Sequence, residues 1–294
     1  MPAPLLIADV PWLLYRAFFS LPKSIKGDGR PVNALLGTVN ALLSAIEARP
    51  ARAVVACFGA EEAVYRVNLY PPYHAQREPM PPELAEQWTR APALLESFGW
   101  TIADAQDLEA DDAMGSFAQA EAHSGGRALL LTGDRDLYQA VNDRVAVLAL
   151  GKGGEEPSEI GPTQVRERYG IPPALVPDFI ALRGDPSDGL PGAPGIGAKT
   201  AAELLLAHGS LEGVLAAAEA GGELRPRVAG ALRENAELLR TFKEIATLVE
   251  LDVERPADRA SDFAGGARAA RELGMERLAK RLEGLAGLAG ASSA

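Results

Sequence analysis

Three short apolar runs separated by helical patterns constrain the fold of this chain more than any other feature. The runs are LLIAD (5–9), AVVACFG (53–59) and ALLLTGD (128–134). Helical patterns accompany them at 33–48, 82–98 and 112–122. Apolar strands that alternate with helices are typical of a parallel sheet whose two faces are both covered by helices. We therefore expect an α/β fold with a mostly parallel central sheet, to which VAVLAL (145–150) adds a fourth strand.

The chain changes character after about residue 162. Successive helical patterns broken by Gly and Pro run from there to about residue 248. We predict a boundary near residue 172, which divides an α/β domain (1–172) from a helical region (173–294). Residues 60–80 lack a clean period and contain several prolines, so we expect a mobile loop or arch at about 60–90.

The composition narrows the class of protein. With 294 residues, 47% of them hydrophobic, the chain can bury a real core. Its one cysteine, Cys57, excludes an internal disulfide and a Cys-based zinc site, and it fits a reducing compartment. The N-terminus does not look like a signal peptide, and no apolar run approaches the ~20 residues that cross a membrane. We expect a cytoplasmic monomer with no membrane partner.

The net charge argues mildly against a nucleic-acid partner. The formal charge is −11 and the pI is about 4.9, whereas binding DNA requires Lys and Arg to neutralise phosphates. A protein that holds cations in a carboxylate pocket, however, gathers negative charge that the metal later cancels. The overall charge therefore does not exclude DNA.

Acidic residues recur at the carboxyl ends of the expected strands, where ligands bind to open α/β sheets. Asp9 ends the first run and Asp134 ends the third, whereas the second ends at Gly59. LEADD (108–112) opens a helix, whose N-terminal dipole favours negative charge. The candidate carboxylates are Asp9, Glu109, Asp111, Asp112, Asp134, Asp136, Asp185 and Asp188.

Oxygen ligands without His or Cys favour hard cations such as Mg²⁺ or Mn²⁺. Two such ions ~4 Å apart can stabilise both the attacking and the leaving oxygen in phosphodiester hydrolysis. Each acidic segment alone has an ordinary explanation, as an acidic helix start, a helix cap or a turn. The combination of the segments is what predicts a two-metal site.

A glycine-rich loop, GLPGAPGIGAKTAAELL (189–205), precedes an apolar helix. Its GIGAKTA portion exposes backbone N–H groups at a helix N-terminus, with Lys199 in the first turn, which suits a phosphate group. The loop is not a P-loop, because position 193 is Ala193 and no strand precedes it. It resembles the hairpin of helix–hairpin–helix proteins, which hold the DNA backbone without reading its sequence.

Four segments together resemble the 5′-nuclease family. They are IADVPWLLYRAFF, LEADDAMGSFA, LLTGDRDLYQAV and ALRGDPSDGLPGAPGIGAKTAAELL, and they occur in order between about residues 5 and 245. The family includes the 5′→3′ exonuclease domain of bacterial DNA polymerase I, flap endonucleases and phage 5′ exonucleases. No polymerase module follows, so the chain resembles a free-standing version. The resemblance implies a PIN/5′-nuclease-like fold and a DNA-binding helix–three-turn–helix at about 184–207.

The resemblance also implies roles for individual residues. A first metal site would use Asp9, Asp111 and Asp112, with Glu109 close by, and a second would use Asp134, Asp136, Asp185 and Asp188. Arg77 would supply positive charge to the scissile phosphate. A potassium ion would accompany the helix–three-turn–helix. DNA would contact Tyr15, Arg16, His74, Arg77, Gly195, Gly197, Lys199 and Thr200.

The chain departs from the family in two places that bear on activity. The family's second strand ends in Phe-Asp, and that Asp serves the first metal site, but here the pair is Phe58-Gly59. His74 stands where the family usually has a lysine. In one hypothesis water replaces the missing ligand and the enzyme demands more metal. In the other the first site stays empty and the protein binds DNA with little activity. We favour the active enzyme.

Three classes of function remain open on the sequence. The preferred one is a 5′→3′ exonuclease or 5′-flap endonuclease that acts on DNA in replication or repair. The second is a binding protein of the same fold that recognises branched DNA. The third is another metal-dependent hydrolase, such as a ribonuclease with a compact acidic site, against which the long hairpin-and-helix region speaks.

Overall fold

A mostly parallel sheet forms the centre of the computed structural model, which describes residues 2–151, 155–222 and 224–291. Within these residues six strands pair in the order β5-β4-β1-β6-β7-β8, and β8 alone runs antiparallel to its neighbour. The strands of this sheet are β1 (Leu5–Asp9), β4 (Ala53–Phe58), β5 (Thr101–Asp104), β6 (Ala128–Leu131), β7 (Val145–Ala149) and β8 (Ser158–Ile160). The short strands β2 (Lys26–Gly27) and β3 (Arg30–Pro31) form a separate antiparallel pair. The predicted α/β class is confirmed.

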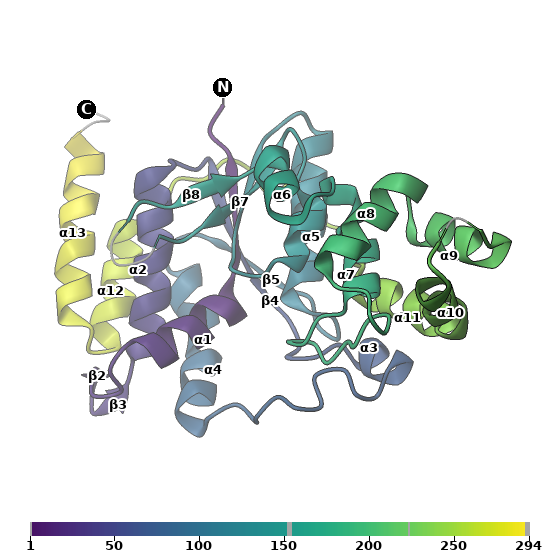
Figure 1. Ribbon diagram of the computed structural model, residues 1–294. Coiled ribbons are helices and arrows are strands. Elements are labelled where there is room, and N and C mark those ends of the chain that lie inside the picture. The colour runs from purple at the N-terminus through teal and green to yellow at the C-terminus, as the bar shows by residue number, and fades with distance from the viewer. Residues whose placement is uncertain (1, 152–154, 223, 292–294) are drawn as a thin grey trace.

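Helices cover both faces of this sheet (Figure 1). In the first part of the chain they are α1 (Val10–Ser20), α2 (Asn33–Ala48), α3 (Val64–Leu69), α4 (Pro82–Glu96) and α5 (Ala110–His123). In the second part they are α6 (Pro162–Tyr169), α7 (Val176–Arg183), α8 (Ala198–His208), α9 (Leu211–Ala220), α10 (Pro226–Glu234), α11 (Ala236–Ala246), α12 (Phe263–Glu272) and α13 (Glu276–Ala291). Short 3₁₀ helices lie at η1 (Asp136–Ala140) and η2 (Pro173–Leu175).

The alternation of side chains along each strand divides the core into two halves. In β1, Leu5 and Ile7 face a cluster formed with α5, α7 and α8, whereas Leu6 and Ala8 face α1, α2, α4, α12 and α13. All five residues of β1 are buried, because this strand lies between β4 and β6 in the middle of the sheet. The uninterrupted apolar runs of the sequence are the consequence.

The last two helices return to the α/β part of the molecule. An extended segment at 248–262 passes along α5, where the Nε of Arg255 donates to the Glu121 carboxylate at 2.8 Å. The chain then forms α12 and α13, which lie beside α2 (Figure 1). The helical region predicted from residue 173 therefore includes a hairpin that packs on the first domain. The boundary near residue 172 stays a prediction.

Several elements were not predicted from the sequence. The edge strands β5 and β8 carry weak periodic signals, because β5 is only partly buried and β8 has three residues. The helix α1 was also not predicted, although its buried residues, Val10, Leu13, Leu14, Ala17 and Phe18, follow the helical spacing. The predicted arch at about 60–90 is partly helical: it contains α3, and α4 begins at Pro82. Residues 70–81 are the irregular part.

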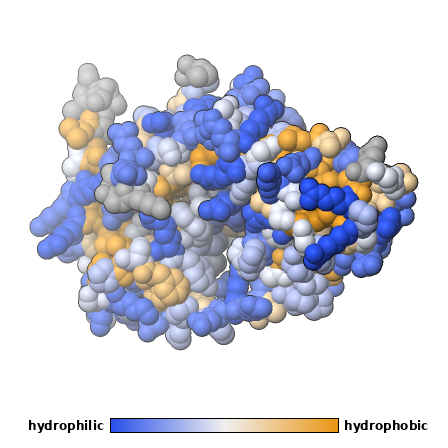
Figure 2. All heavy atoms as spheres, in the orientation of Figure 1, coloured by the Kyte–Doolittle hydropathy of each residue, from blue (hydrophilic) through white to orange (hydrophobic). Residues whose placement is uncertain are grey.

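The surface seen in Figure 2 is mainly hydrophilic, and apolar side chains gather over α8 and α9. Across the described ranges, no single helix has both the length and the hydropathy to span a bilayer. The α8 and α9 helices reach that threshold only as a pair, and they are bent by 85° relative to one another.

Candidate functional site

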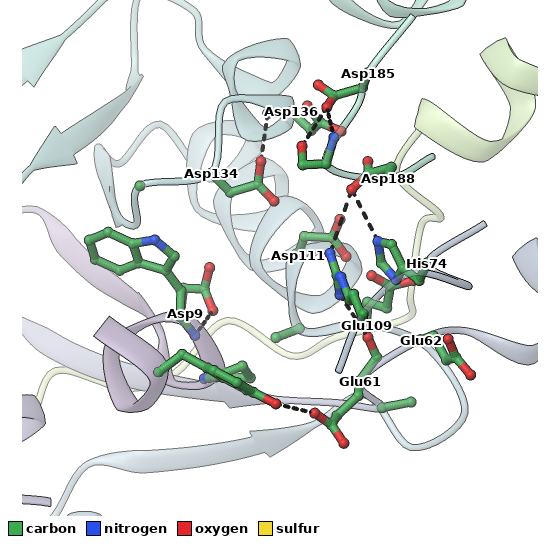
Figure 3. Close-up of a pocket in the computed structure, with 18 of the residues that line it drawn as sticks. Asp9, Glu61, Glu62, His74, Glu109, Asp111, Asp134, Asp136, Asp185 and Asp188 are labelled. Carbon is green, nitrogen blue, oxygen red and sulfur yellow. Dashed lines mark hydrogen bonds and ion pairs between the residues drawn. The ribbon is translucent and has the colours of Figure 1, made fainter. Parts of the chain in front are cut away.

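The predicted carboxylates surround a cavity of about 1030 Å³ at the carboxyl edge of the sheet. Asp9 ends β1, and Asp134 and Asp136 follow β6. Asp111 lies in the first turn of α5. Asp185 and Asp188 come from the loop between α7 and α8 and face the others across the cavity (Figure 3). Parallel strands end at the same edge, which is why segments far apart in the sequence meet here.

Asp112 is the exception among the predicted metal ligands. It is fully buried and does not line the cavity. One of its carboxylate oxygens accepts hydrogen bonds from Arg66 Nη2 and from the backbone N–H of Val249, both at 2.8 Å. The other accepts from the backbone N–H of Glu109 at 3.2 Å, which caps the start of α5. The structure thus separates Asp112, which anchors the helix, from Asp111, which faces the cavity.

A buried arginine, Arg66 of α3, faces the acidic start of α5. Its side chain is 2% exposed. Nη1 lies 2.9 Å from a Glu109 carboxylate oxygen and 3.7 Å from one of Asp111, and Nη2 binds Asp112. Nε donates to the carbonyl of Ile245 at 3.1 Å. The guanidinium therefore offsets the repulsion among three carboxylates and ties α3, α5 and α11 together.

Sequence reasoning missed Arg66. In the sequence, Arg66 lies seven residues after Gly59, in a segment that we expected to be a loop. A lone arginine in such a segment looks like a surface residue, because Arg is almost never fully buried unless it is paired. Only the fold shows that α3 directs this side chain at the acidic helix start.

Glu109 holds the segment after β4 against the start of α5 through hydrogen bonds. Its carboxylate accepts hydrogen bonds from the backbone N–H of Ala63 at 3.0 Å and from the hydroxyl of Tyr73 at 3.1 Å. Burial raises the pKa of Tyr73, so its hydroxyl keeps the proton that it donates. With Arg66 as a third partner, Glu109 is held largely by the protein, although it also lines the cavity.

Gly59 marks the strand end where a carboxylate was expected. A Cβ built at this residue would lie 2.6 Å from both the carbonyl oxygen of Leu108 and the backbone nitrogen of Ala110. The close approach is secured by a 2.8 Å hydrogen bond from the N–H of Ala60 to the carbonyl of Leu108. The backbone that leads into α5 therefore occupies the space in which an Asp side chain would begin.

The cavity carboxylates raise one another's pKa values. Burial, followed by repulsion from Asp9, Asp188 and Asp185, raises the pKa of Asp134 to about 7. Burial and the neighbouring Asp134 raise the pKa of Asp136. For Asp111, burial outweighs the opposing effect of Arg66, and its pKa is also raised. Ionised together, these groups destabilise the site unless a cation neutralises them.

The donor set fits hard divalent cations better than any other ligand. All of the convergent donors are carboxylate oxygens, and their mutual repulsion is the cost that a bound cation would remove. As they stand, no three His, Cys, Asp or Glu side chains in the described residues are close enough to hold an ion among them. Metal binding would therefore require these side chains to move closer together.

Of the residues predicted to contact DNA, Tyr15, His74 and Arg77 line the cavity. The Tyr15 hydroxyl binds the Glu61 carboxylate, and Arg77 donates to the Glu61 carbonyl at 3.1 Å. Arg16 is exposed. His74 is buried, and its Nε2 lies 3.0 Å from an Asp188 carboxylate oxygen. His74 thus faces a predicted metal ligand.

The predicted helix–three-turn–helix is a loop at 184–197 between α7 and α8. Gly195 has a φ of 79°, a conformation that favours glycine, and no atom lies within 4 Å of a Cβ built at either Gly195 or Gly197. Gly197 caps α8, whose first turn carries Lys199 and Thr200. Lys199 is 89% exposed. The loop therefore offers an open helix N-terminus to an anion.

Substitution of Gly59 is expected to destabilise the protein, because backbone atoms block the new Cβ. Gly59→Ala should lower the free energy of unfolding by about 1–3 kcal/mol, and Gly59→Asp by at least as much. Gly230→Ala is the control: it lies within α10 with open space around it, so it should be neutral or slightly stabilising. Urea denaturation measures all three. A Gly59→Asp protein as stable as the natural one would contradict this account.

Removal of the Arg66 guanidinium should leave buried carboxylates without compensation. Arg66→Met is expected to cost about 3–5 kcal/mol of unfolding free energy. Arg30→Met breaks an exposed pair, in which Arg30 is 67% exposed, and should cost less than about 1 kcal/mol. Equal effects of the two substitutions in chemical denaturation would show that Arg66 does not offset the acidic cluster.

Stability without metal should fall as the pH rises. The folded-state pKa of Asp134, about 7, lies above its unfolded value of about 3.9, so the folded protein holds this proton more tightly. The contribution is complete below about pH 4 and is lost as the pH rises through 7. In EDTA the melting temperature should therefore drop between pH 5.5 and 8, and Mg²⁺ should raise it more at pH 8.

Asp134→Asn is the matched control for this pH profile. The neutral amide should flatten the decline in EDTA between pH 5.5 and 8 and reduce the effect of Mg²⁺. An identical Mg²⁺ shift at both pH values in the natural protein would contradict the assignment of cation binding to these carboxylates.

Comparison with known proteins places the chain in a family. A family model described as "5'-3' exonuclease, N-terminal resolvase-like domain" matches residues 4–170. A second, "5'-3' exonuclease, C-terminal SAM fold", matches residues 171–262. A 5'-3' exonuclease of Mycobacterium tuberculosis is 36% identical over 323 residues, which cover 98% of this chain and 100% of that protein.

The chain is also similar to part of a longer protein and to solved structures. The thermostable DNA polymerase I of Thermus thermophilus is 40% identical over 210 residues, which cover 71% of this chain and 25% of the polymerase. A bacteriophage T5 flap endonuclease, solved as a complex with DNA and metal ions, has the same fold with a TM-score of 0.68 at 19% identity. The match covers 97% of this chain and 99% of that one. The resemblance seen in the sequence is confirmed, and the chain belongs to the 5′-3′ exonuclease family.

Proposed function

We propose that this protein is a metal-dependent, structure-selective nuclease that hydrolyses phosphodiester bonds of DNA at 5′ ends and 5′ flaps, in replication or repair. One observation carries the proposal. Carboxylates from β1, α5, the loop after β6 and the loop before α8 line one cavity, in a chain of the 5′-3′ exonuclease family. We further propose that the protein works as a cytoplasmic monomer.

Two groups of carboxylates would hold two Mg²⁺ or Mn²⁺ ions. Asp9 and Asp111, with Glu109 beside them, form the first group. The second group comprises Asp134, Asp136, Asp185 and Asp188. Such ions would supply a metal-activated water as the nucleophile and would stabilise the oxygen that leaves. Asp112, predicted as a ligand of the first ion, is now proposed to hold α5 in place, because Arg66 and Val249 occupy its carboxylate.

The protein side chains would bind and orient the DNA. Arg77, half exposed at the rim with Nη2 3.5 Å from Asp188, is placed to contact the phosphate next to the metal groups. Tyr15, Arg16 and His74 line or flank the same cavity. Gly195, Gly197, Lys199 and Thr200 would hold the duplex backbone at the N-terminus of α8, where the family resemblance also implies a potassium ion. Contacts to phosphate make binding depend steeply on salt.

The first metal group is proposed to be the weaker one. Gly59 brings no carboxylate, and the Arg66 guanidinium already compensates part of the negative charge at Asp111 and Glu109. In the second group, Asp185 pairs with Arg183 at 3.3 Å, and Asp188 lies 3.0 Å from His74 and 3.5 Å from Arg77. Among the described residues, Asp134 and Asp136 form no ion pair with a Lys, Arg or His. Because four carboxylates converge in the second group and two of them, Asp134 and Asp136, are not compensated, this group should bind its ion first. Catalysis should then require a metal concentration high enough to fill the first group as well. The alternative is a branched-DNA-binding protein whose first group stays empty.

Cleavage of a 5′-labelled flap duplex tests the proposed function. The natural protein should cut the flap in Mg²⁺ or Mn²⁺, with a metal dependence that reports more than one ion. Asp136→Ala should reduce cleavage to the metal-free level, because it removes a ligand of the second group. Asp143→Ala, an exposed residue outside the cavity, should cut like the natural protein.

Binding of the same flap distinguishes the two candidate functions. A natural protein that binds the flap tightly in low salt but does not cut it in either metal would favour the branched-DNA-binding alternative. A protein that neither binds nor cuts flaps or 5′ ends would overturn both.

A further inference from the structure

A buried hydroxyl, that of Thr132, lies between the two proposed metal groups. Thr132 follows β6 and has no exposed surface. Its Oγ1 donates to Oδ2 of Asp9 at 2.7 Å, and it accepts from the backbone N–H of Asp134 at 3.0 Å. Asp9 belongs to the first proposed group and Asp134 to the second. One side chain therefore touches a residue of each.

The chemistry of these groups determines the direction of both hydrogen bonds. The backbone N–H of Asp134 can only donate, so the hydroxyl accepts there and gives its single hydrogen to the Asp9 carboxylate. The other oxygen of Asp9 accepts from the N–H of Trp12 at 3.0 Å, which begins α1. The Asp9 carboxylate is thus held from both sides, and its remaining lone pairs are free for the cavity.

The hydrogen-bond chain continues into the second group. Oδ1 of Asp134 accepts from the backbone N–H of Asp136 at 2.9 Å. A series of hydrogen bonds therefore joins the end of strand β1 to the loop after β6. It runs from Asp9 through Thr132 and Asp134 to Asp136. The pairing of β1 with β6 ends at Ala8 and Leu131, and the Thr132 hydroxyl extends the connection to the carboxylates.

We propose that Thr132 is a positioning residue that sets the spacing between the two metal groups. This inference rests on the proposed two-metal function. Two ions that act on one phosphate must lie ~4 Å apart, so a small displacement of Asp9 relative to Asp134 matters. Residues that orient metal ligands through hydrogen bonds typically change metal affinity or activity by about 10–100-fold when they are replaced.

The chain offers a matched control for the loss of a buried threonine hydroxyl. Thr38 in α2 is 1% exposed, and its Oγ1 has no hydrogen-bond partner among the described residues. Thr132→Val and Thr38→Val make the same chemical change in a buried site. Only the first removes a donor to a carboxylate of the cavity. Thr132→Ser keeps the hydroxyl.

The test measures binding of Mn²⁺ alone by electron paramagnetic resonance of the free ion at fixed pH, and the Mg²⁺ dependence of flap cleavage. Thr132→Val should weaken Mn²⁺ binding and raise the Mg²⁺ concentration for half-maximal cleavage by about 10-fold or more. Thr132→Ser should stay close to the natural protein, and Thr38→Val should match it. Unchanged Mn²⁺ binding and Mg²⁺ dependence in Thr132→Val would overturn the inference.

Thermal melting in EDTA establishes that each variant is folded. If Thr132→Val does not fold, the comparison uses Thr132→Ala and Thr132→Ser, which differ by one oxygen atom. Weaker Mn²⁺ binding by the Ala variant than by the Ser variant supports the inference. Equal Mn²⁺ binding by the two variants overturns it. The proposed function fails separately, if the natural protein cuts no flap or 5′ end. Even then, the Mn²⁺ titrations decide whether Thr132 positions the two groups.

Discussion

Repulsion among carboxylates at one edge of the sheet is the constraint on which the rest of this structure depends. The parallel strands deliver Asp9 and Asp134 to the same edge, and the loop before α8 adds Asp185 and Asp188. Burial raises the pKa values of several of these groups, which means that the fold stores unfavourable charge there. A cation bound among these groups would relieve the repulsion, which supports the proposed metal-dependent function. The carboxylates of the cavity account for part of the chain's net charge of −11.

The repulsion among the carboxylates is compensated differently on the two sides of the cavity. On the α5 side the protein supplies its own cation: Arg66 contacts Glu109, Asp111 and Asp112. On the opposite side, Asp185 and Asp188 contact Arg183, His74 and Arg77. Among the described residues, Asp134 and Asp136 form no such pair, and the proposed metal ion would compensate their charge. Gly59 contributes to this arrangement, because the absence of a side chain allows the backbone before α5 to pack against the end of β4. This close packing places the acidic start of α5 near Arg66. The proposed difference in metal affinity between the two groups rests mainly on these two residues.

Much of the fold could be predicted from the sequence, because its strong signals are local. The apolar runs at 5–9, 53–59 and 128–134 became β1, β4 and β6, and the strand-end acids Asp9 and Asp134 reached the cavity as strand geometry requires. The edge strand β5 was not predicted, because none of its four residues is fully buried and the segment therefore lacks a clear apolar run. The glycine-rich segment was predicted to be a loop that precedes an apolar helix, and α8 begins directly after Gly197.

What the sequence could not supply were the contacts that depend on three-dimensional neighbours. Asp111 and Asp112 are adjacent and chemically identical, yet one faces the cavity and the other binds Arg66 and Val249. The partner of the acidic helix start was expected to be metal, and the structure places a guanidinium there. Likewise, nothing in the letters LTGD shows that the Thr132 hydroxyl reaches a carboxylate 123 positions away.

The most direct test of this account is the anomalous diffraction of crystals soaked in increasing Mn²⁺, with a 5′-flap DNA bound. We predict a first peak among Asp134, Asp136, Asp185 and Asp188, and a second near Asp9 and Asp111 at higher concentration. Arg66 should remain on Asp112 throughout. An ion bound to Asp112 in place of Arg66, or no ion beside Asp134 and Asp136, would contradict the account.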